Sequence, residues 1–253
     1  MAENDDRIRG SSQVPLSPLG KIQVDELGRR IKAKGGVHSI IASDMHRTID
    51  TAKAIQKHNP DAKIHEITPD LNAWRMGGDE GKPTKEVLPK MLHRIELHPD
   101  EGPAPGLGPI STKPGESFNE FRLRSLKKTK EFLDDNIDPD ARELAVAHYR
   151  NIRLLESWIK NGSPDDLSID TQEMLKKGDS EPGDLFHVTH DGKQYQIDKV
   201  NLTNNEPLKP GKYFARHGVT EWNAENGAGQ RIKQEKAADK SQPDLVHSVQ
   251  SSF

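Results

Sequence analysis

The chain has 253 residues, a length that fits one large α/β domain or two small ones. Hydrophobic residues make up only 32% of it and charged residues 30%, which indicates that part of the chain lies outside the packed core. The net charge of −3 gives no electrostatic reason to expect binding to nucleic acid or to an anionic membrane.

The absence of cysteine excludes disulfides, thiolate zinc sites and cysteine nucleophiles, but it does not identify a compartment. The sequence shows no signal-peptide pattern and no apolar run near the ~20 residues that a membrane helix needs. We therefore expect a soluble, cytoplasmic protein.

The first predicted helix follows a polar segment, residues 1–15. Ser17 is typical of a helix N-cap, and the pair Gly35 and Gly36 is typical of a C-terminal stop. The apolar stripe predicted for this helix excludes Val24 and consists of Ile22, Leu27 and Ile31.

The next two elements bring Arg47 to an edge of the predicted sheet. Residues 37–42 form a short apolar run without alternation, as in a strand buried on both faces. Ser43 and Asp44 are typical caps for a helix that runs to about His58. Arg47 lies in the first turn of that helix, where backbone N–H groups also point toward anions.

An insertion rich in Gly and Pro, residues 71–114, follows a second predicted strand at residues 63–67. Its one predicted regular element is a helix over residues 84–97. An insertion over a sheet edge is a usual place for a lid or a specificity loop, although a plain surface excursion fits equally well.

The following segments alternate helix and strand and bring His148 to a strand end. A helix begins after Ser117 and ends near Asn136. Residues 143–147 form a strand that leads directly to His148, and a further helix then reaches Asn161.

The next part of the chain is mostly polar. Residues 163–181 are predicted to be irregular, and residues 184–189 and 194–200 are predicted to form a hairpin. Residues 201–210 form a linker. Residues 224–253 show almost no apolar periodicity, so we expect a disordered or loosely tethered tail.

Between the linker and the tail, the apolar run of residues 213–215 predicts a buried strand that leads into Arg216, His217 and Gly218. Gly lets the backbone bend close to a ligand, Arg offers a planar fork for an oxyanion, and His offers a base or nucleophile that titrates near neutrality. A lone Arg-His-Gly triplet also occurs by chance at ordinary strand ends.

Three strand ends therefore present His217, Arg47 and His148, together with Arg216. The carboxyl ends of parallel strands meet at one edge of a sheet, where open α/β folds bind ligands. Two arginines and two histidines at one point would place four donors around a phosphoryl group. The sequence thus predicts a phosphate site at this edge.

With these motifs the chain resembles the histidine phosphatase superfamily, in its phosphoglycerate mutase-like branch. The segments that carry the resemblance are residues 216–223 (Arg-His-Gly-Val-Thr-Glu-Trp-Asn), 7–10, 14–20, 42–48, 115–117 and 147–148. The resemblance covers most of residues 7–223. It implies a phosphoglycerate mutase-like fold, a three-layer α/β/α sandwich with a mostly parallel central sheet.

The order of the motifs differs from that of the family, in which the Arg-His-Gly strand comes first. Reading from Lys212 to Asn223 and resuming near Arg7 restores the family order, so the chain resembles a circular permutant. We then expect a single domain over residues 1–223, in which residues 184–211 join the old end to the old start. In the alternative, the last strand inserts into a second copy and forms a swapped dimer.

The resemblance implies a role for each pocket residue. His217 would take the phosphoryl group on one ring nitrogen while the Gly218 carbonyl holds the other, and water would then cleave the phosphohistidine. The groups that would bind the phosphoryl oxygens are Arg216, Arg47, His148, Asn223 and the backbone N–H of Tyr149. The groups that would face the substrate are Thr220, Arg9 and Gly10. No metal or organic cofactor would be required.

Two positions depart from the family pattern. Ala73 stands where the family usually has a glutamate that protonates the leaving group. Asp79 or Glu80 could replace this acid from the Gly-rich loop, but both are more readily interpreted as solvated loop charges. Tyr149 stands where a glycine often follows the second histidine, and its ring should narrow the pocket.

The sequence thus favours a metal-independent phosphatase that acts on a small phosphomonoester. The missing glutamate favours hydrolysis over phosphoglycerate mutase-type transfer. The alternative from another class is a non-catalytic phosphate-binding or assembly module, which the retained pocket residues oppose. A metal centre built on His217 and His148 lacks a third ligand at a suitable spacing.

Overall fold

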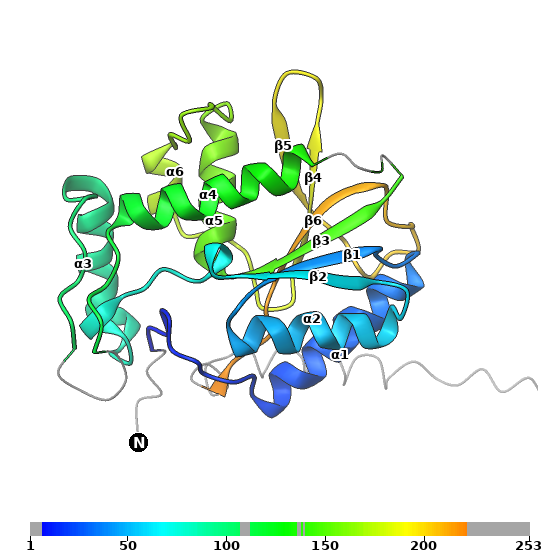
Figure 1. Cartoon of the computed structure of the whole chain (residues 1–253), viewed down its shortest axis with the longest axis horizontal. Coiled ribbons are helices and arrows are strands. Elements are labelled where there is room, and N and C mark those ends of the chain that lie inside the picture. The colour runs from blue at the N-terminus through cyan, green and yellow to red at the C-terminus, as the bar shows by residue number, and fades with distance from the viewer. Residues whose placement is uncertain (1–6, 107–111, 136–137, 139, 222–253) are drawn as a thin grey trace, which may run out of the picture.

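The structure is a computed structural model that describes residues 7–106, 112–135, 138 and 140–221. Within this part of the chain, the centre is a six-stranded sheet with the order β2-β1-β3-β6-β4-β5 (Figure 1). The strands are β1 (Ser39–Ser43), β2 (Lys63–Thr68), β3 (Arg142–Ala147), β4 (Leu185–His190), β5 (Tyr195–Lys199) and β6 (Gly211–Arg216). The run from β2 to β6 is parallel, and β4 and β5 form an antiparallel hairpin at one edge.

Helices cover both faces of this sheet. They are α1 (Pro18–Ala33), α2 (His46–His58), α3 (Thr84–Leu97), α4 (Phe118–Asp134), α5 (Tyr149–Lys160) and α6 (Thr171–Leu175). α1 and α2 lie on one face, whereas α4 and α5 lie on the opposite face with α6 beside them (Figure 1). The predicted three-layer sandwich with a mostly parallel sheet is confirmed.

The central strands bury apolar side chains on both of their faces. Ile41 and Phe214 belong to the core cluster that includes residues of α4 and α5. Ile40 and Tyr213, their neighbours in the chain, belong to the cluster that includes residues of α1 and α2. This double burial explains why the sequence of these strands shows no alternation of apolar and polar residues.

The face of α1 that meets the core differs from the predicted stripe. Val24 is buried, whereas Ile22 is 47% exposed. Val24, Leu27 and Ile31 follow the i, i+3, i+7 spacing of one helix face, and Ile22 lies off that face. The predicted N-cap is confirmed, because the Ser17 side chain accepts a hydrogen bond from the backbone N–H of Gly20.

The predicted caps of α2 were wrong. The helix begins at His46, with Met45 as its N-cap and no side-chain cap hydrogen bond. The hydroxyl of Ser43 instead contacts the side chains of Thr48 and His148, at 2.6 and 2.8 Å. A serine between a strand and a helix suits both roles, so sequence alone did not separate a cap from a site residue.

The other elements mostly follow the prediction. α3 spans the predicted residues 84–97, and α4 begins after Ser117 and ends at Asp134. The hairpin of β4 and β5 is confirmed. The prediction that residues 163–181 are irregular was wrong at α6, whose first turn is capped by Asp170.

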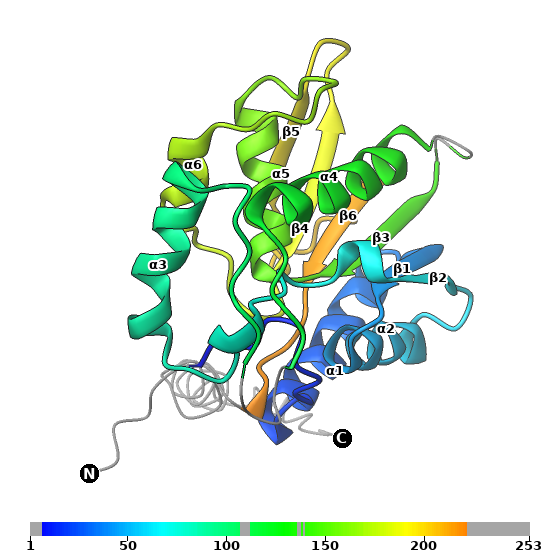
Figure 2. The same cartoon turned by 60° about the vertical axis from the view of Figure 1, so that its left-hand side comes forward.

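The insertion packs on the N-terminal segment. The backbone N–H of Ile8 donates to the Lys82 carbonyl at 2.9 Å, and that of Gly81 donates to the Ile8 carbonyl at 2.7 Å. Figure 2 shows this segment between the body of the molecule and the turn before α3. The segment around Ile8 and the insertion are therefore joined by backbone hydrogen bonds.

Three strand ends meet at one edge of the sheet, because β1, β3 and β6 are parallel neighbours. β1 leads into the first turn of α2, which carries Arg47. β3 is followed directly by His148, and β6 is followed directly by His217. Asn223 and residues 224–253 lie outside the described residues. Among the described helices, none is long and apolar enough to cross a membrane.

Candidate active site

The structure brings His217, His148 and Arg47 together below the surface. The two imidazole ring centroids are 5.1 Å apart, and Arg47 Nε donates to His148 Nδ1 at 3.3 Å. Each of the three residues is at most 3% exposed. Charged and titratable side chains that are buried this close together are typical of a functional site, here one in which an anion can take the place of water around them.

His217 has one ring nitrogen available for chemistry. Its Nδ1 donates to the carbonyl of Gly218 at 2.7 Å, so the neutral ring carries its lone pair on Nε2. Burial lowers the pKa of His217 well below its usual value, and the positive charges of Arg47, Arg9 and Arg216 lower it further. At neutral pH the ring is therefore uncharged, and its lone pair lies on Nε2.

His148 is fixed by a chain of hydroxyl groups. Its Nδ1 accepts from Arg47, so Nε2 carries the proton and donates to the Ser43 hydroxyl at 2.8 Å. Ser43 in turn contacts the hydroxyl of Thr48, which donates to the Met45 carbonyl at 2.7 Å. Burial lowers the pKa of His148 well below its usual value, and the positive charge of Arg47 adds to the effect.

Arg47 is held by backbone carbonyls. Its Nη1 donates to the carbonyl of Ser12 at 2.8 Å, and its Nη2 donates to that of Gly10 at 3.0 Å. Burial, followed by the positive charge of Arg9, lowers the pKa of Arg47 to about 9, and the negative charge of Glu80 works in the opposite direction. The guanidinium remains charged at neutral pH.

Arg216 lies over an aromatic ring at the end of β6. Its guanidinium carbon is 5.0 Å from the ring centroid of Tyr149, and its Nη1 donates to the carbonyl of Ser180. Within the described part of the chain, the buried Nε of Arg216 has no hydrogen-bond partner. Tyr149, predicted to narrow the pocket, thus packs on Arg216, and its hydroxyl accepts a hydrogen bond from the backbone N–H of Gly178 at 3.0 Å.

The remaining predicted site residues within the described part of the chain lie in the N-terminal segment (Arg9 and Gly10) and in the loop after β6 (Thr220). Arg9 Nη1 donates to the hydroxyl of Thr220 at 3.3 Å, and Thr220 forms a β-bridge with Leu16. Gly10 adopts φ of +46°, a conformation that favours glycine. The positive charge of Arg9 lowers the pKa of His217, so Arg9 lies within electrostatic reach of the site.

The interpretation of Asp79 and Glu80 as solvated charges was wrong, because both side chains are buried. Asp79 pairs with Lys82 at 2.9 Å and with Arg94 at 3.0 Å. Burial raises the pKa of Asp79, but the hydrogen bonds from these two cations outweigh it and leave the pKa below its usual value. This burial was not predictable from local sequence, because Arg94 lies 15 residues further along the chain, in α3.

No cluster of three His, Asp or Glu side chains suited to a metal ion occurs among the described residues. The groups that meet at this site are guanidinium groups, imidazoles, hydroxyls and backbone groups. Its positive charge and its hydrogen-bond donors suit an oxyanion.

Comparison with known proteins decides the family. Residues 1–202 match the model of the histidine phosphatase superfamily (branch 1). The chain belongs to this superfamily. No curated protein matches the sequence.

Solved structures share the phosphoglycerate mutase-like fold of this chain. A mycobacterial glucosyl-3-phosphoglycerate phosphatase in complex with VO3 has 18% sequence identity and a TM-score of 0.57, with 78% of this chain and 91% of that chain covered. The alpha-ribazole phosphatase from Shigella flexneri has 15% identity and a TM-score of 0.57, with 80% and 90% covered. A mycobacterial hydrolase has 15% identity and a TM-score of 0.55, with 94% and 92% covered.

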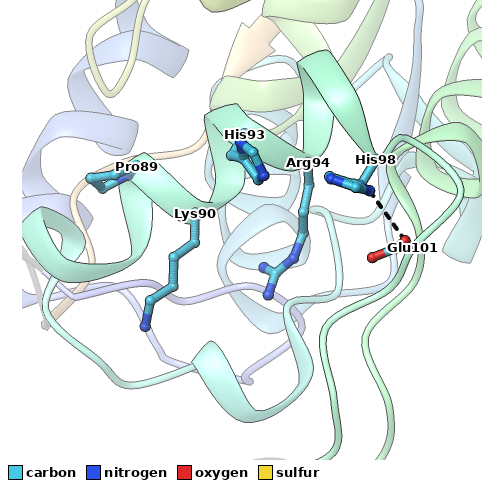
Figure 3. A pocket seen from close by; sticks show the side chains of 6 residues that line it. All are labelled: Pro89, Lys90, His93, Arg94, His98 and Glu101. Carbon is cyan, nitrogen blue, oxygen red and sulfur yellow. Dashed lines mark hydrogen bonds and ion pairs between the residues drawn. The ribbon is translucent and has the colours of Figure 1, made fainter.

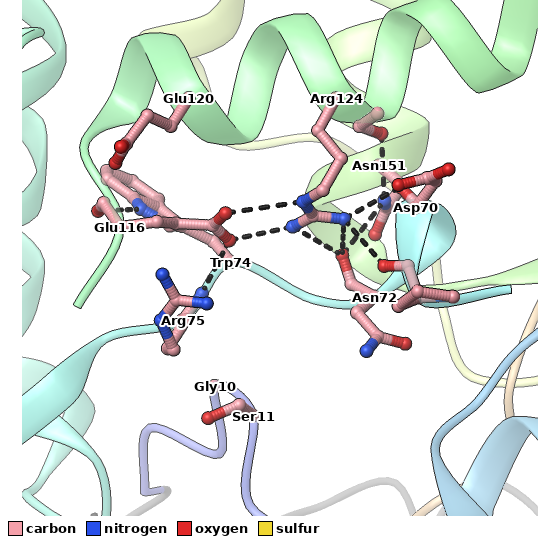
Figure 4. A network of polar contacts seen from close by, with 12 residues as sticks. Gly10, Ser11, Asp70, Asn72, Trp74, Arg75, Glu116, Glu120, Arg124 and Asn151 are labelled. Atoms are coloured by element: carbon pink, nitrogen blue, oxygen red, sulfur yellow. Dashed lines mark hydrogen bonds and ion pairs between the residues drawn. The ribbon is translucent and has the colours of Figure 1, made fainter. Parts of the chain in front are cut away.

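The segment around Ala73 is held in place by α4. Arg124 pairs with Glu116 at 2.7 Å and donates to the carbonyl of Asp70 at the same distance (Figure 4). Glu116 also accepts at its carbonyl from Trp74 Nε1, at 2.9 Å. Ala73 therefore occupies an ordered segment, in which a methyl group replaces the family's usual glutamate.

A surface cleft lies on α3, apart from the residues of this site. It is lined by Pro89, Lys90, His93, Arg94, His98 and Glu101 (Figure 3). His98 contacts Glu101 at 3.2 Å, and the guanidinium of Arg94 is occupied by Asp79. None of these side chains contacts His217, His148 or Arg47 in a described interaction.

Proposed function

We propose that this histidine phosphatase hydrolyses a small phosphomonoester through a phosphohistidine on His217. The observation that carries the proposal is the hydrogen bond from Nδ1 to the Gly218 carbonyl, which leaves Nε2 of a neutral ring free. A neutral imidazole nitrogen in a buried, positively charged pocket is suited to attack phosphorus.

The phosphoryl oxygens would be bound by Arg47, Arg216 and His148. Arg216 offers a buried Nε donor that has no partner among the described residues, and Arg47 offers a charged guanidinium. A dianionic phosphoryl group would offset the positive charges that keep the pKa of His148 low. His148 would then gain a proton at Nδ1, give up the hydrogen bond from Arg47 Nε and donate to the anion, while Nε2 stays on Ser43.

The reaction proceeds in two displacements. In the first, Nε2 of His217 forms a bond to phosphorus, and the bond from phosphorus to the leaving oxygen breaks with its electron pair on that oxygen. In the second, water attacks phosphorus and loses a proton, the N–P bond breaks, and the electron pair returns to Nε2. Inorganic phosphate is released and the ring is restored.

The substrate is expected to have a leaving group that departs without an acid. Ala73 cannot protonate it, and Asp79 is held as a carboxylate by Lys82 and Arg94. The rate should therefore depend steeply on the pKa of the leaving group. Mutase-type transfer would need acid and base help in both directions, so hydrolysis fits these residues better.

We also propose that the chain is a circular permutant of the family order. The strand that carries Arg216 and His217 comes last among the described elements, yet it lies inside the sheet, between β3 and β4. The family match ends at residue 202, before β6 begins at Gly211. In this arrangement residues 1–223 form one domain, residues 71–114 cover the site as a lid, and residues 184–211 join the old end to the old start.

The test is release of phosphate from a series of aryl phosphates with graded leaving-group pKa. We expect turnover by the wild type, a steep fall with rising leaving-group pKa, and background rates for His217→Ala. Equal rates for the wild type and His217→Ala would contradict the proposal. Orthovanadate binding without turnover would leave the chain as a phosphate-binding module.

A further inference from the structure

Glu80 joins the insertion to the loop of residues 10–12. Its Oε1 accepts from the backbone N–H and from the hydroxyl of Ser11, both at 2.8 Å. Its Oε2 accepts from the hydroxyl of Ser12 at 2.8 Å, and the backbone N–H of Met76 donates to Oε1 at 3.0 Å. The side chain is 6% exposed, so these contacts replace water around a buried carboxylate.

Arg47 binds the same loop through its carbonyl groups. Nη1 donates to the Ser12 carbonyl, and Nη2 donates to the Gly10 carbonyl. The N–H and hydroxyl groups of the loop thus meet Glu80, while its carbonyls meet Arg47. The loop lies between the carboxylate and the guanidinium.

The loop fits closely against Glu80. A Cβ at Gly10 would lie 2.3 Å from Glu80 Oε1, so only glycine allows this approach. Backbone hydrogen bonds between Ile8 and the residues after Glu80, Gly81 and Lys82, fix the same segment from its other end. The loop cannot move away from Glu80 without breaking several of these contacts.

We propose that Glu80 is a positioning residue for phosphate binding: it holds the loop of residues 10–12 so that the loop's carbonyls orient Arg47 toward the anion. The inference rests on the proposed function, since it takes Arg47 as a ligand of the phosphoryl group. Four donors converge on the two oxygens of Glu80, which suits an acceptor and not an acid that protonates a leaving group.

The charge of Glu80 has a second effect on Arg47. Burial, followed by the charge of Arg9, lowers the pKa of Arg47 to about 9, and the charge of Glu80 raises it. His148 is a further titratable side chain in contact with this guanidinium. Removal of the Glu80 charge therefore lowers the pH at which Arg47 loses its proton and its affinity for an anion.

The test is orthophosphate binding, measured by isothermal titration calorimetry from about pH 6 to about pH 10. Glu80→Gln keeps the shape of the side chain but removes its charge and one acceptor. We expect about tenfold weaker binding at neutral pH, the loss of roughly one charge-assisted hydrogen bond. Binding should also begin to fail at a lower alkaline pH than in the wild type.

Asp79→Asn is the matched control. Asp79 is as buried as Glu80 and lies in the same turn, but its partners are Lys82 and Arg94. We expect this variant to unfold at lower temperature while it binds orthophosphate like the wild type over the whole pH range. Ser12→Ala removes a single bond to Glu80 and should show a smaller shift in the direction of Glu80→Gln, which keeps the test open if Glu80→Gln does not fold.

The inference is overturned if Glu80→Gln and Ser12→Ala bind orthophosphate with the affinity and the pH dependence of the wild type. Equal losses in Glu80→Gln and Asp79→Asn would overturn it too, because they would mean that any buried charge in this turn acts through stability alone. A wild type that binds neither orthophosphate nor orthovanadate would instead overturn the proposed function, and the inference with it.

Discussion

At the scale of single residues, His217 and His148 differ in the ring nitrogen that carries the proton. His217 donates from Nδ1 to the Gly218 carbonyl, which leaves Nε2 without a proton. His148 accepts at Nδ1 from Arg47 and donates from Nε2 to Ser43. The hydrogen-bond partners of these two identical side chains therefore place the lone pair on Nε2 in His217 and on Nδ1 in His148.

Both histidines should make stability depend on pH. Their pKa values in the folded protein lie well below the usual 6.5, so the unfolded chain takes up protons first as the pH falls. Their contribution is complete above pH 6.5 and decreases below it. We expect the free energy of unfolding to fall by about 1 kcal/mol per histidine between about pH 7.5 and about pH 5.5.

Urea unfolding at the two pH values measures this fall. The double variant His148→Gln with His217→Gln should show a smaller fall than the wild type. His187, whose pKa is also lowered by burial, remains in both proteins and accounts for part of the residual dependence. A double variant with the full pH dependence of the wild type would contradict the prediction.

Residue types at strand ends were predictable, and buried partners far away in sequence were not. Arg47, His148 and His217 each follow an apolar run, so sequence alone placed them at one edge. Glu80 was misjudged because the groups that bury it, Ser11 and Ser12, lie about seventy residues away. Loop charges are usually solvated, and only the contact between two loops reverses that rule here.

At the scale of elements, the start of α1 holds the loop that follows His217. The backbone N–H of Ser17 donates to the Val219 carbonyl at 3.0 Å, and the side chain of Gln23 accepts from the Val219 N–H at the same distance. A Cβ at Gly20 would lie 1.9 Å from the Val219 carbonyl oxygen. The helix and the loop can approach this closely because residue 20 has no side chain.

Gly20→Ala should destabilise the protein, although alanine favours a helix. The gain in helix propensity is about 1 kcal/mol, whereas overpacking against a backbone carbonyl costs about 1–3 kcal/mol. The loop must shift to admit the methyl group, and kcat/KM toward an aryl phosphate should fall about tenfold or more because His217 moves with the loop.

Urea unfolding and initial-rate kinetics check this variant. Lys21→Ala, at an exposed position in the same helical turn, is the control and should stay within about 0.5 kcal/mol of the wild type. If the stability and the kinetics of Gly20→Ala match those of Lys21→Ala, the close contact between residue 20 and Val219 contributes to neither.

Local signals predicted most elements, and the misses came from tertiary contacts. α3 was predicted over its observed residues, because its boundaries are set by the neighbouring sequence. The burial of Val24 instead of Ile22 is decided by what α1 packs against, and the role of Ser43 is decided by His148 across the sheet edge. The apolar pattern of a sequence predicts the presence of a helix more reliably than it predicts which face of that helix is buried.

At the scale of the whole molecule, the order of the strands in the sheet differs from their order along the chain. β6 follows every other described element, yet it pairs with β3 in parallel and with β4 in antiparallel orientation. The loop after it reaches back to the start of the chain, where Arg9 donates to Thr220 at 3.3 Å. A chain that ran from β6 directly into the segment of Arg9 would make the same contacts.

A re-ordered chain tests whether either order folds. Residues 209–223 are moved in front of residue 4, so that the chain begins with β6 and ends at Leu208, which keeps the buried Leu208 and the contacts of Lys34 with Asn204 and Glu206. The sheet pairings are unchanged and only the connecting loops differ in length, so stability should change by only about 1 kcal/mol. The re-ordered chain should unfold cooperatively in urea and bind orthophosphate like the wild type, whereas deletion of residues 209–223 without their transfer should abolish binding, because β6 carries Arg216 and leads into His217. A re-ordered chain that remains unfolded, beside a folded wild type, would argue against the proposed permutation.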